Sequence, residues 1–547
     1  MDEGAIELSK NKYEIDMCNG TIMDKLVSFA IPLMVSGILQ LMFNAVDIIV
    51  VGRFSGSQAL AAVGSTTALI NVFTNLFIGV SLGANVLAAR FYAAGKAKEM
   101  SETVHTSVTL ALVSGVAMAA VGLVFSRWAL EVMGTPADVI DQSTLYMRIY
   151  FLGMPFFMLY NYGAAILRAV GDTRRPLLFL VVAGVTNAVL NMILVIVFHL
   201  GVAGVAIATI ISQLISCILV LRCLYMTDSS YQLRFSRLCM KKFYLVQIFQ
   251  VGIPAGVQST VINISNALLQ SSVNSFGSTA MAGYTAANNI LGFLYASVNA
   301  VTQACMSFTS QNYGAGKTKR MDRVLIDCLI LSCAFSLTMG CCAWFFGPQL
   351  LQIYTESSAV ISCGVEILSF TTVTYFLCGI MDLIPGALRG MGRSAVPMIL
   401  SIIGTVGTRI VWIFWIFPYH RSLDILFLSY PVSWILTAWF SSVTILMFGE
   451  RVSACGGSWK EWPVFGRVLV PFFTYYGTHS LTVMCTHLVP VIAFFKVAAG
   501  RMMYPGVLGS TPWDILLLAL VLAVEPGVVR LIETRLPWMN GRKKRSK

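Results

Sequence analysis

A stripe of polar side chains runs along one face of an otherwise apolar segment near the start of the chain. Gln40, Asn44 and Asp47 are spaced i, i+4 and i+7, so they share one face if the segment is a helix. Placing an ionised carboxylate at the centre of a bilayer costs about 2.5–3.5 kcal/mol of insertion free energy. Asp47 should therefore face a cavity, be paired or be protonated. Asp47 is therefore a candidate proton carrier or cation ligand, and Arg53 is the alternative fixed partner.

Other polar residues lie within later apolar segments. Asp382 is a second acid, and because Arg409 could neutralise it, a structural ion pair and a substrate role both stay open. Amides in membranes also simply link helices by hydrogen bonds worth about 0.6 kcal/mol each, and that interpretation stays open for every amide here. The remaining candidates for the coupling site or the substrate cavity are Asn161, Asn187, Asn191, Thr209, Asn263, Asn266 and Gln270.

The composition is that of an integral membrane protein. Hydrophobic residues make up 57% of the chain and charged residues 11%, against about 25% charged residues in soluble domains. No Asp, Glu, Lys or Arg occurs from Phe243 to Gly316 or from Pro176 to Leu221, and one helical span needs about 20 apolar residues. Strand-like alternation is absent, which predicts an all-α membrane fold. The predicted spans are 26–50, 60–88, 104–125, 145–166, 177–198, 202–222, 246–272, 281–309, 324–346, 362–387, 396–417 and 425–448, with two more near 481–499 and 513–530.

An internal repeat relates the two halves of the twelve-span region. The segment from Leu167 to Pro176 recurs in the second half from Leu388 to Pro397, with Leu, Arg, Gly and Pro at matching places. An even number of spans in each half keeps the same orientation, so the repeat predicts two parallel six-helix lobes related by an axis along the membrane normal. The position equivalent to Asp47 is Leu268 or Leu269, so the architecture does not require an acid there. That asymmetry favours a functional role for Asp47.

The distribution of Lys and Arg predicts the orientation. One set of loops carries most of them, whereas the opposite loops of the first twelve spans carry only Arg53, Arg127 and Arg421. By the positive-inside rule both termini are expected in the cytoplasm, and the net charge of +12 reflects this bias, not binding of nucleic acid. The expected domains are a tail (1–25), an N-lobe (26–224), a linker (225–245), a C-lobe (246–450), a second linker (451–480) and an extension (481–547).

Several chemistries find no support in the sequence. The 13 cysteines are scattered without CxxC or Cys/His spacing, so neither a metal nor a disulfide is expected. No Walker A sequence is present, so ATP hydrolysis within this chain is not expected to drive it. No cofactor is implied, and the protein is expected to be a secondary transporter with no enzymatic activity, whose halves move around a shared cavity.

The segment from Phe43 to Arg53 resembles the first-helix motif of the MATE (multidrug and toxic compound extrusion) transporters. The paired LRxxG…P loops and the paired YxAGK loops, Tyr92–Lys96 and Tyr313–Lys317, are also similar to that family, and the DinF-like branch is the most similar. The resemblance covers about residues 25–450. It implies a monomeric exporter of organic cations or drugs in the bacterial inner membrane, in contact with lipids and driven by inward H⁺ or Na⁺.

The resemblance also implies a first-lobe cation site. Residue by residue, its members are Asp47, Asn161, Asn187, Asn191 and Thr209. The family often has Asp where this chain has Asn191, and a hard cation such as Na⁺ prefers charged oxygen ligands, so the substitution favours H⁺ coupling. The alternative function is a flippase for lipid-linked precursors. An anionic lipid calls for basic residues in the cavity, and the spans offer few, chiefly Arg148 and Arg409.

The chain continues beyond the region that resembles MATE transporters. The stretch from Phe473 to His487 is similar to the end of acyltransferase 3 type membrane proteins, but only about two spans are present. His479 and His487 are therefore expected to be structural, and the extension a non-catalytic remnant. The terminal basic run from Arg542 to Lys547 suits anionic lipid at the cytoplasmic face.

Overall fold

The computed structural model describes residues 13–419 and 421–453. Internal contacts divide the chain into two units, Met1–Ser441 and Ser442–Lys547, and both predicted lobes belong almost wholly to the first. All regular elements in the described residues are helical, as the composition predicts. Ten of these helices are long and apolar enough to span a membrane, or up to 12 spans if each of two bent pairs counts as one. They coincide with the twelve predicted spans. The predicted spans 481–499 and 513–530, and with them His479 and His487, lie outside the described residues.

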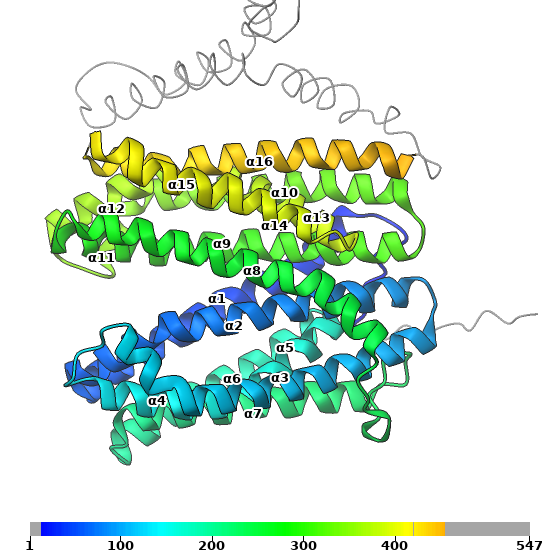
Figure 1. The fold of residues 1–547 in the computed structure, drawn as a ribbon, viewed down its shortest axis with the longest axis horizontal. Coiled ribbons are helices and arrows are strands. Elements are labelled where there is room, and N and C mark those ends of the chain that lie inside the picture. Colours follow the sequence, from blue (N-terminus) through cyan, green and yellow to red (C-terminus); the bar gives the residue numbers. More distant parts are fainter. Residues whose placement is uncertain (1–12, 420, 454–547) are drawn as a thin grey trace, which may run out of the picture. The chain divides into compact units, whose positions relative to one another are not determined.

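The first half of the chain forms the N-lobe (Figure 1). Its long apolar helices follow one another with short connections, and a five-residue π-helix continues the sixth α-helix. The elements are α1 (Met23–Phe54), α2 (Gly56–Ala93), α3 (Ala97–Val132), α4 (Ile140–Leu152), α5 (Met154–Ala169), α6 (Arg174–Met192), η1 (Ile193–Val197), α7 (Gly201–Tyr225) and the short 3₁₀ turn η2 (Phe235–Arg237).

The second half forms the C-lobe, drawn from green to orange in Figure 1. Its fifth span alternates between α- and π-helical turns, whereas the equivalent span of the N-lobe has one π-helical stretch. The elements are α8 (Lys242–Asn274), α9 (Ser278–Gly314), α10 (Thr318–Phe345), α11 (Gly347–Gln352), α12 (Ser358–Thr371), α13 (Tyr375–Gly390), α14 (Ala395–Ser401), η3 (Ile402–Gly407), α15 (Thr408–Val411), η4 (Trp412–Ile416), η5 (Phe417–Tyr419) and α16 (Leu423–Ser453).

The fourth span of each lobe is bent. α4 and α5 meet at 46°, and α12 and α13 meet at 51°. Pro155 lies in the first turn of α5, where its missing N–H prevents the hydrogen bonding of α4 from continuing into α5. Pro385 lies well inside α13, so the bend of the tenth span, which falls between Thr371 and Tyr375, is not at the proline.

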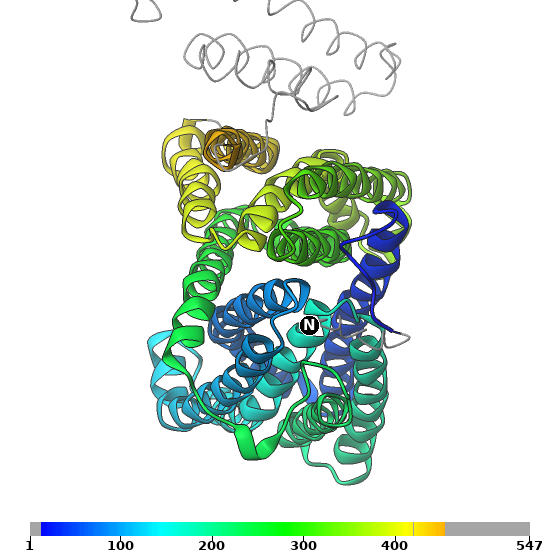
Figure 2. The same ribbon diagram turned by 90° about the vertical axis from the view of Figure 1, so that its right-hand side faces the viewer.

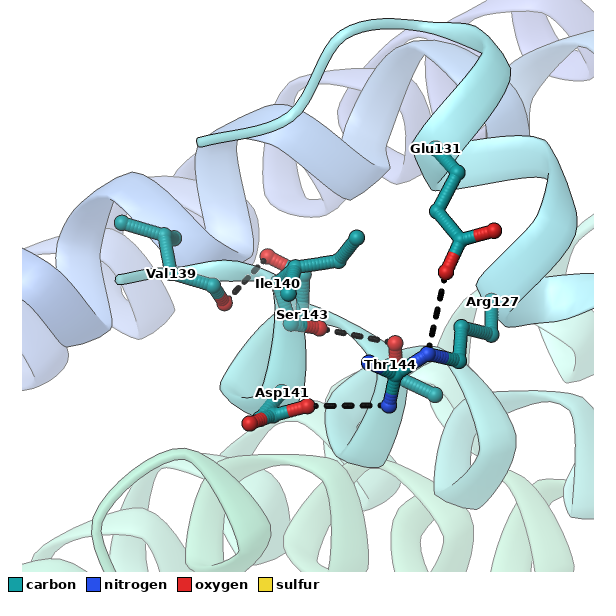
Figure 3. A network of polar contacts seen from close by, with 7 residues as sticks. All are labelled: Arg127, Glu131, Val139, Ile140, Asp141, Ser143 and Thr144. Carbon is teal, nitrogen blue, oxygen red and sulfur yellow. Dashed lines mark hydrogen bonds and ion pairs between the residues drawn. The ribbon is translucent and has the colours of Figure 1, made fainter. Parts of the chain in front are cut away.

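The short helix α4 is tied to α3 at the end of the N-lobe where α3 stops (Figure 3). Arg127 donates from Nε to Glu131 at 3.1 Å and from Nη1 to Asp141 at 3.0 Å. All three side chains are more than half exposed, so water and salt screen these ion pairs and they contribute little to stability. Ser143 and Thr144 donate to carbonyls one turn earlier in α4.

The lobes meet closely near the start of α1 and α8 and the end of α2 and α9, which we call the closed end (right in Figure 1). Here glycines remove the side chains that would keep helices apart: a Cβ on Gly256 would lie 2.9 Å from the Cα of Leu76. Ser307 of α9 donates to Asn85 of α2 at 3.1 Å, and Asn85 is fully buried. Towards their other ends the same four helices carry many exposed positions, so the lobes are joined mainly at this end.

The repeated sequence motifs lie at the closed end and join its parts. The guanidinium of Arg90 stacks on the ring of Tyr313, 4.8 Å from its centroid, and lies against Gly392 of the second LRxxG…P loop. Gly171 of the first such loop has a positive φ of 97° and lies against the backbone of Ile15. Both loops therefore use a glycine where another part of the chain approaches, which accounts for the recurrence of the motif.

The segment before α1 crosses the closed end and contacts both lobes (Figure 2). Glu14 accepts hydrogen bonds from Tyr92 of α2 at 2.8 Å and from Tyr231, in the linker that follows α7, at 2.7 Å. On the C-lobe side, Asn312 donates to the carbonyl of Met17 at 3.1 Å, and Met17 is fully buried. The carbonyls and side chains of residues 17–19 also accept hydrogen bonds from Lys317 and Arg320. This N-terminal segment therefore holds the lobes together.

Candidate functional site

Asp47 of α1 lies in the N-lobe within a cluster of amide and hydroxyl groups. Asn191 of α6 donates from Nδ2 to the Asp47 carboxylate and, at 3.2 Å, to Oδ1 of Asn187. Asn187 in turn donates to Thr209 of α7 at 3.5 Å. Asn191 is fully buried and Asn187 is 5% exposed. Helices α1, α6 and α7 thus bring together four of the predicted site residues.

The Asp47 carboxylate has no ion-pair partner among the described residues. Arg53, the alternative partner considered from the sequence, is exposed in the last turn of α1 and makes no ion pair with Asp47. The carbonyl oxygen of Asn191 is also buried without a hydrogen-bond partner. An acid and an unsatisfied amide oxygen therefore lie side by side in an apolar lobe, an arrangement that can accept a proton or a small cation.

The fifth member that the family resemblance implies is not in this cluster. Asn161 of α5 donates to the carbonyl of Phe157 at 2.9 Å, one turn earlier in its own helix, and makes no hydrogen bond to Asp47. Two tyrosines that were not among the sequence candidates lie near the cluster. Tyr146 and Tyr150 of α4 are close enough to Asp47 to interact with it electrostatically. Their i, i+4 spacing marks one face of α4, but such spacing is equally typical of ordinary packing.

The distance between α1 and α6 depends on a glycine. The ring of Phe43 lies where a Cβ on Gly184 would be, so α1 can approach α6 closely only because residue 184 has no side chain. Phe43 is one turn before Asp47, and Gly184 is two turns before Asn191. This contact therefore sets the spacing across which Asn191 reaches Asp47.

Gly184→Ala is expected to separate α1 from α6 and to weaken the Asn191–Asp47 hydrogen bond. Overpacking of this kind costs about 1–3 kcal/mol, so the melting temperature of the purified protein should fall together with its transport rate. Gly64→Ala is the matched control, because a Cβ there meets nothing within 4 Å. Phe43→Leu should partly rescue Gly184→Ala by making room for the methyl group. Equal effects of the two alanine variants would show that the Phe43 contact does not position the site.

The C-lobe holds a different set of polar groups. Asp382 of α13 lies near Arg389 of the same helix and interacts with it electrostatically. Arg389 donates to Gln258 at 2.6 Å, and Gln258 donates to Ser401 at 2.8 Å. Asp382 is therefore not brought together with the N-lobe cluster.

Of the two alternatives left open for Asp382, the structure does not show the ion pair with Arg409. Arg409 donates from Nη1 to Asn266 at 2.6 Å and from Nε to Ser433 at 3.3 Å, and its guanidinium lies over the ring of Tyr430. No ion pair joins it to Asp382 within the described residues. The cause is geometric: Arg409 is directed towards α8 and α16, which sequence separation alone does not reveal.

The polar stripes on α1 and α8 are mostly exposed. Of the predicted cavity residues, Gln40 and Asn44 on α1 and Asn263 and Gln270 on α8 are exposed, whereas Asn266 is half-buried beneath Arg409. In the described part of the chain no group of three or more His, Cys, Asp or Glu side chains is arranged to hold a metal ion. The cysteines described there are free thiols.

Comparison with known proteins identifies the family. The MatE family model matches the chain twice, over residues 32–193 and 254–415, which together exceed half its length. One match falls in each half of the chain, in agreement with the internal repeat.

Individual relatives agree with the family match. "Probable multidrug resistance protein YoeA" of Bacillus subtilis is 28% identical over 75% of this chain and 90% of its own length. "Probable multidrug resistance protein NorM" of Thermotoga maritima is 24% identical over 82% of this chain and 95% of its own length. A crystal structure of MATE in complex with MaL6 has a TM-score of 0.75 and 22% identity, and covers 82% of this chain and 100% of that one, which supports the fold. The chain is a multi-pass membrane protein of the MATE family of multidrug efflux transporters, which are not enzymes.

Proposed function

We propose that this protein exports organic cations, including lipophilic drugs, by antiport with H⁺ through alternating access. The observation that carries the proposal is the position of Asp47: an acid within an apolar lobe, hydrogen-bonded by Asn191 and without a cationic partner among the described residues. Such an acid attracts either a proton or a cationic substrate, and competition between the two couples their movements. The names of the relatives, which include multidrug resistance and export proteins, agree with drugs as substrates.

The amide of Asn191 gives Asp47 two matched hydrogen-bonding states. When Asp47 is ionised, it accepts from Asn191 Nδ2. When Asp47 is protonated, a half turn of the amide presents the now unsatisfied Oδ1 as an acceptor for the acid proton. A carboxylate at position 191 would instead add negative charge. The four side chains supply only one formal charge, which favours H⁺ over Na⁺ because hard cations prefer charged oxygen ligands.

We assign the closed end to the cytoplasmic face of a bacterial inner membrane. The loops at this end carry Lys96, Lys98, Arg174, Lys317 and Lys319, as the positive-inside rule requires of cytoplasmic loops. Both termini of the twelve-span region would then be cytoplasmic, and the described conformation would be open to the outside. Membership of the DinF-like branch and a monomeric state are part of the same proposal.

The test is export of ethidium from everted vesicles under separately imposed gradients. We expect the transport rate to follow a pH gradient and to be indifferent to a Na⁺ gradient at constant pH. Export that follows Na⁺ alone would contradict H⁺ coupling but keep the antiporter. If no organic cation is exported under either gradient, the proposed substrate class is wrong.

The N-terminal segment must detach from one lobe before the closed end can open. Burial raises the pKa of the Cys18 thiol, which keeps it protonated and slow to react with a maleimide. Glu14→Ala removes the acceptor for Tyr92 and Tyr231. In a background in which Cys18 is the only cysteine, this change should speed labelling by about tenfold or more, because hydrogen bonds to charged groups contribute about 1.5–3 kcal/mol.

Glu131→Ala is the control for this experiment, since Glu131 is an exposed acid in a surface ion pair with Arg127 (Figure 3). It should leave the labelling rate of Cys18 unchanged. Equal labelling of Cys18 in the wild-type background and in Glu14→Ala would show that the segment does not depend on Glu14 for its attachment.

A further inference from the structure

Arg409 is a buried cation within the C-lobe that has no carboxylate partner among the described residues. It is 3% exposed and lies in α15, between the π-helices η3 and η4. Its hydrogen bonds go to neutral groups, to Asn266 at 2.6 Å and to Ser433 at 3.3 Å, and its Cζ lies 4.5 Å from the ring centroid of Tyr430. The guanidinium therefore retains donors for a further acceptor.

The internal repeat allows Arg409 to be compared with the equivalent position of the N-lobe. When the two family matches are aligned from their first residues, 32 and 254, Arg409 corresponds to Asn187 and Asn266 corresponds to Asn44. Each lobe thus has a polar contact between its first and fifth spans: Asp47 with Asn191 in the N-lobe, and Asn266 with Arg409 in the C-lobe. The N-lobe contact contains an acid and the C-lobe contact contains a base, so the two lobes have opposite charge at related places.

The charge of Arg409 is not needed to join the helices. In the N-lobe a neutral amide occupies the equivalent position and joins α6 to α7 through Thr209. A glutamine at position 409 could likewise donate to Asn266 without the cost of burying a cation in the membrane. The hydrogen bonds and the aromatic ring around Arg409 reduce that cost but supply no negative charge. A buried cation without a counter-ion is therefore best explained by an anion that arrives from outside the chain.

The exposed residues of α8 indicate from which side a substrate could reach Arg409. Asn263 and Gln270 lie one turn before and one turn after Asn266 on the same face, and both are exposed. Asn266 itself is half-buried and bonded to the guanidinium. The Asn266 amide thus connects the exposed face of α8 directly to Arg409.

We propose that Arg409 binds the carboxylate or phosphate of the transported molecule, so that the C-lobe recognises substrates with an anionic group. The planar fork of a guanidinium matches both oxyanions through paired N–H donors. Substrates that also carry a positive charge would engage Asp47 in the N-lobe, so amphoteric molecules would satisfy both lobes. This inference rests on the proposed export function and extends its substrate class.

The test uses a pair of dyes that differ in one carboxylate. Rhodamine B has a cationic ring system and a carboxylate, and its ethyl ester has the same ring system without the acid. Export of both is measured in proteoliposomes of neutral lipid for wild type, Arg409→Gln and Arg409→Lys. In Arg409→Gln we expect the KM for rhodamine B to rise by about tenfold or more, with little change for the ester. Arg409→Lys keeps the positive charge but lacks the planar fork, so its KM for rhodamine B should lie between those of wild type and Arg409→Gln.

Several results would overturn the inference. Equal loss of both dyes in Arg409→Gln and Arg409→Lys would assign Arg409 a purely structural role. Arg389→Gln removes a half-buried arginine of the same lobe. If it alters the ratio of the two KM values, for the acid and for the ester, as strongly as Arg409→Gln does, the effect is not specific to Arg409. A defect that appears only when anionic lipid is present would assign the oxyanion to a lipid headgroup. Failure of wild type to export either dye would count against the proposed function itself.

Discussion

Asp47→Asn is expected to reduce pH-driven export of ethidium to the level of vesicles without the protein. The variant keeps the shape of the side chain and its carbonyl acceptor for Asn191, so the N-lobe should fold and the melting temperature should change little. It removes the only titratable group in the cluster with Asn187, Asn191 and Thr209, and with it the exchange between a proton and a cation.

Two further variants, Asp47→Glu and Asp382→Asn, test whether the loss of export is specific to the carboxylate at position 47. Glu retains a titratable group at a shifted position, so part of the export should survive. If Asp382→Asn abolishes export while Asp47→Asn does not, coupling belongs to the C-lobe network of Asp382 and Arg389. The exposed Asp141 at the α3–α4 connection provides a neutral comparison, since Asp141→Asn should leave export unchanged.

Gly256→Leu is expected to hold the closed end apart and to block export. A Cβ at this position would lie 2.9 Å from the Cα and 3.0 Å from the carbonyl carbon of Leu76 in α2. These are backbone atoms that cannot move aside as a flexible side chain does. Overpacking costs about 1–3 kcal/mol, which corresponds to a shift of about 5–150-fold in the balance between closed and open conformations.

Spin labels at Lys98→Cys and Thr318→Cys, in a background without other cysteines, measure this shift directly. Both positions are exposed near the closed end, one in each lobe. Gly256→Leu should move the distance distribution to longer values, whereas Gly64→Leu, at a glycine with nothing within 4 Å of its Cβ, should not. An unchanged distribution in Gly256→Leu would show that the contact with Leu76 does not control closure.

The helical architecture could be predicted from the sequence because it depends on a strong local signal. Runs of apolar residues as long as Phe243–Gly316 must form helices in a bilayer, and the recurrence of the Leu167–Pro176 segment at Leu388–Pro397 separates two equal halves. The bend in the tenth span was not located, because it lies between Thr371 and Tyr375 and not at Pro385. Proline marks a helix that is able to bend, whereas packing decides where it bends.

The candidate site was only partly predictable. Helical spacing places Gln40, Asn44 and Asp47 on one face. The family resemblance groups Asp47 with the candidates Asn187, Asn191 and Thr209, and the fold brings these four together. Asn161 instead bonds its own helix. Spacing within a helix cannot specify which neighbouring helix a side chain meets. For the same reason the sequence does not show that Arg409 meets Asn266 and not Asp382.

The glycines at the closed end are visible in the sequence, but only the structure shows what each of them contacts. Gly256 looks like an ordinary glycine of a membrane helix, but a side chain there would meet the backbone of Leu76 in α2. The repeated loops that contain Gly171 and Gly392 identified the family, and in the structure they receive Ile15 and Arg90. Their recurrence thus reflects how the lobes are joined.

The most direct test of H⁺-coupled export through Asp47 is proton movement driven by a drug gradient. Purified protein is reconstituted with a pH-sensitive dye inside the vesicles, and an ethidium gradient is imposed without any initial pH or Na⁺ gradient. We expect protons to move against the direction of ethidium in the wild type, at a rate that Na⁺ does not change, and we expect no proton movement in Asp47→Asn. Proton movement of equal rate in Asp47→Asn, or ethidium transport without any proton movement in the wild type, would contradict H⁺-coupled export through Asp47.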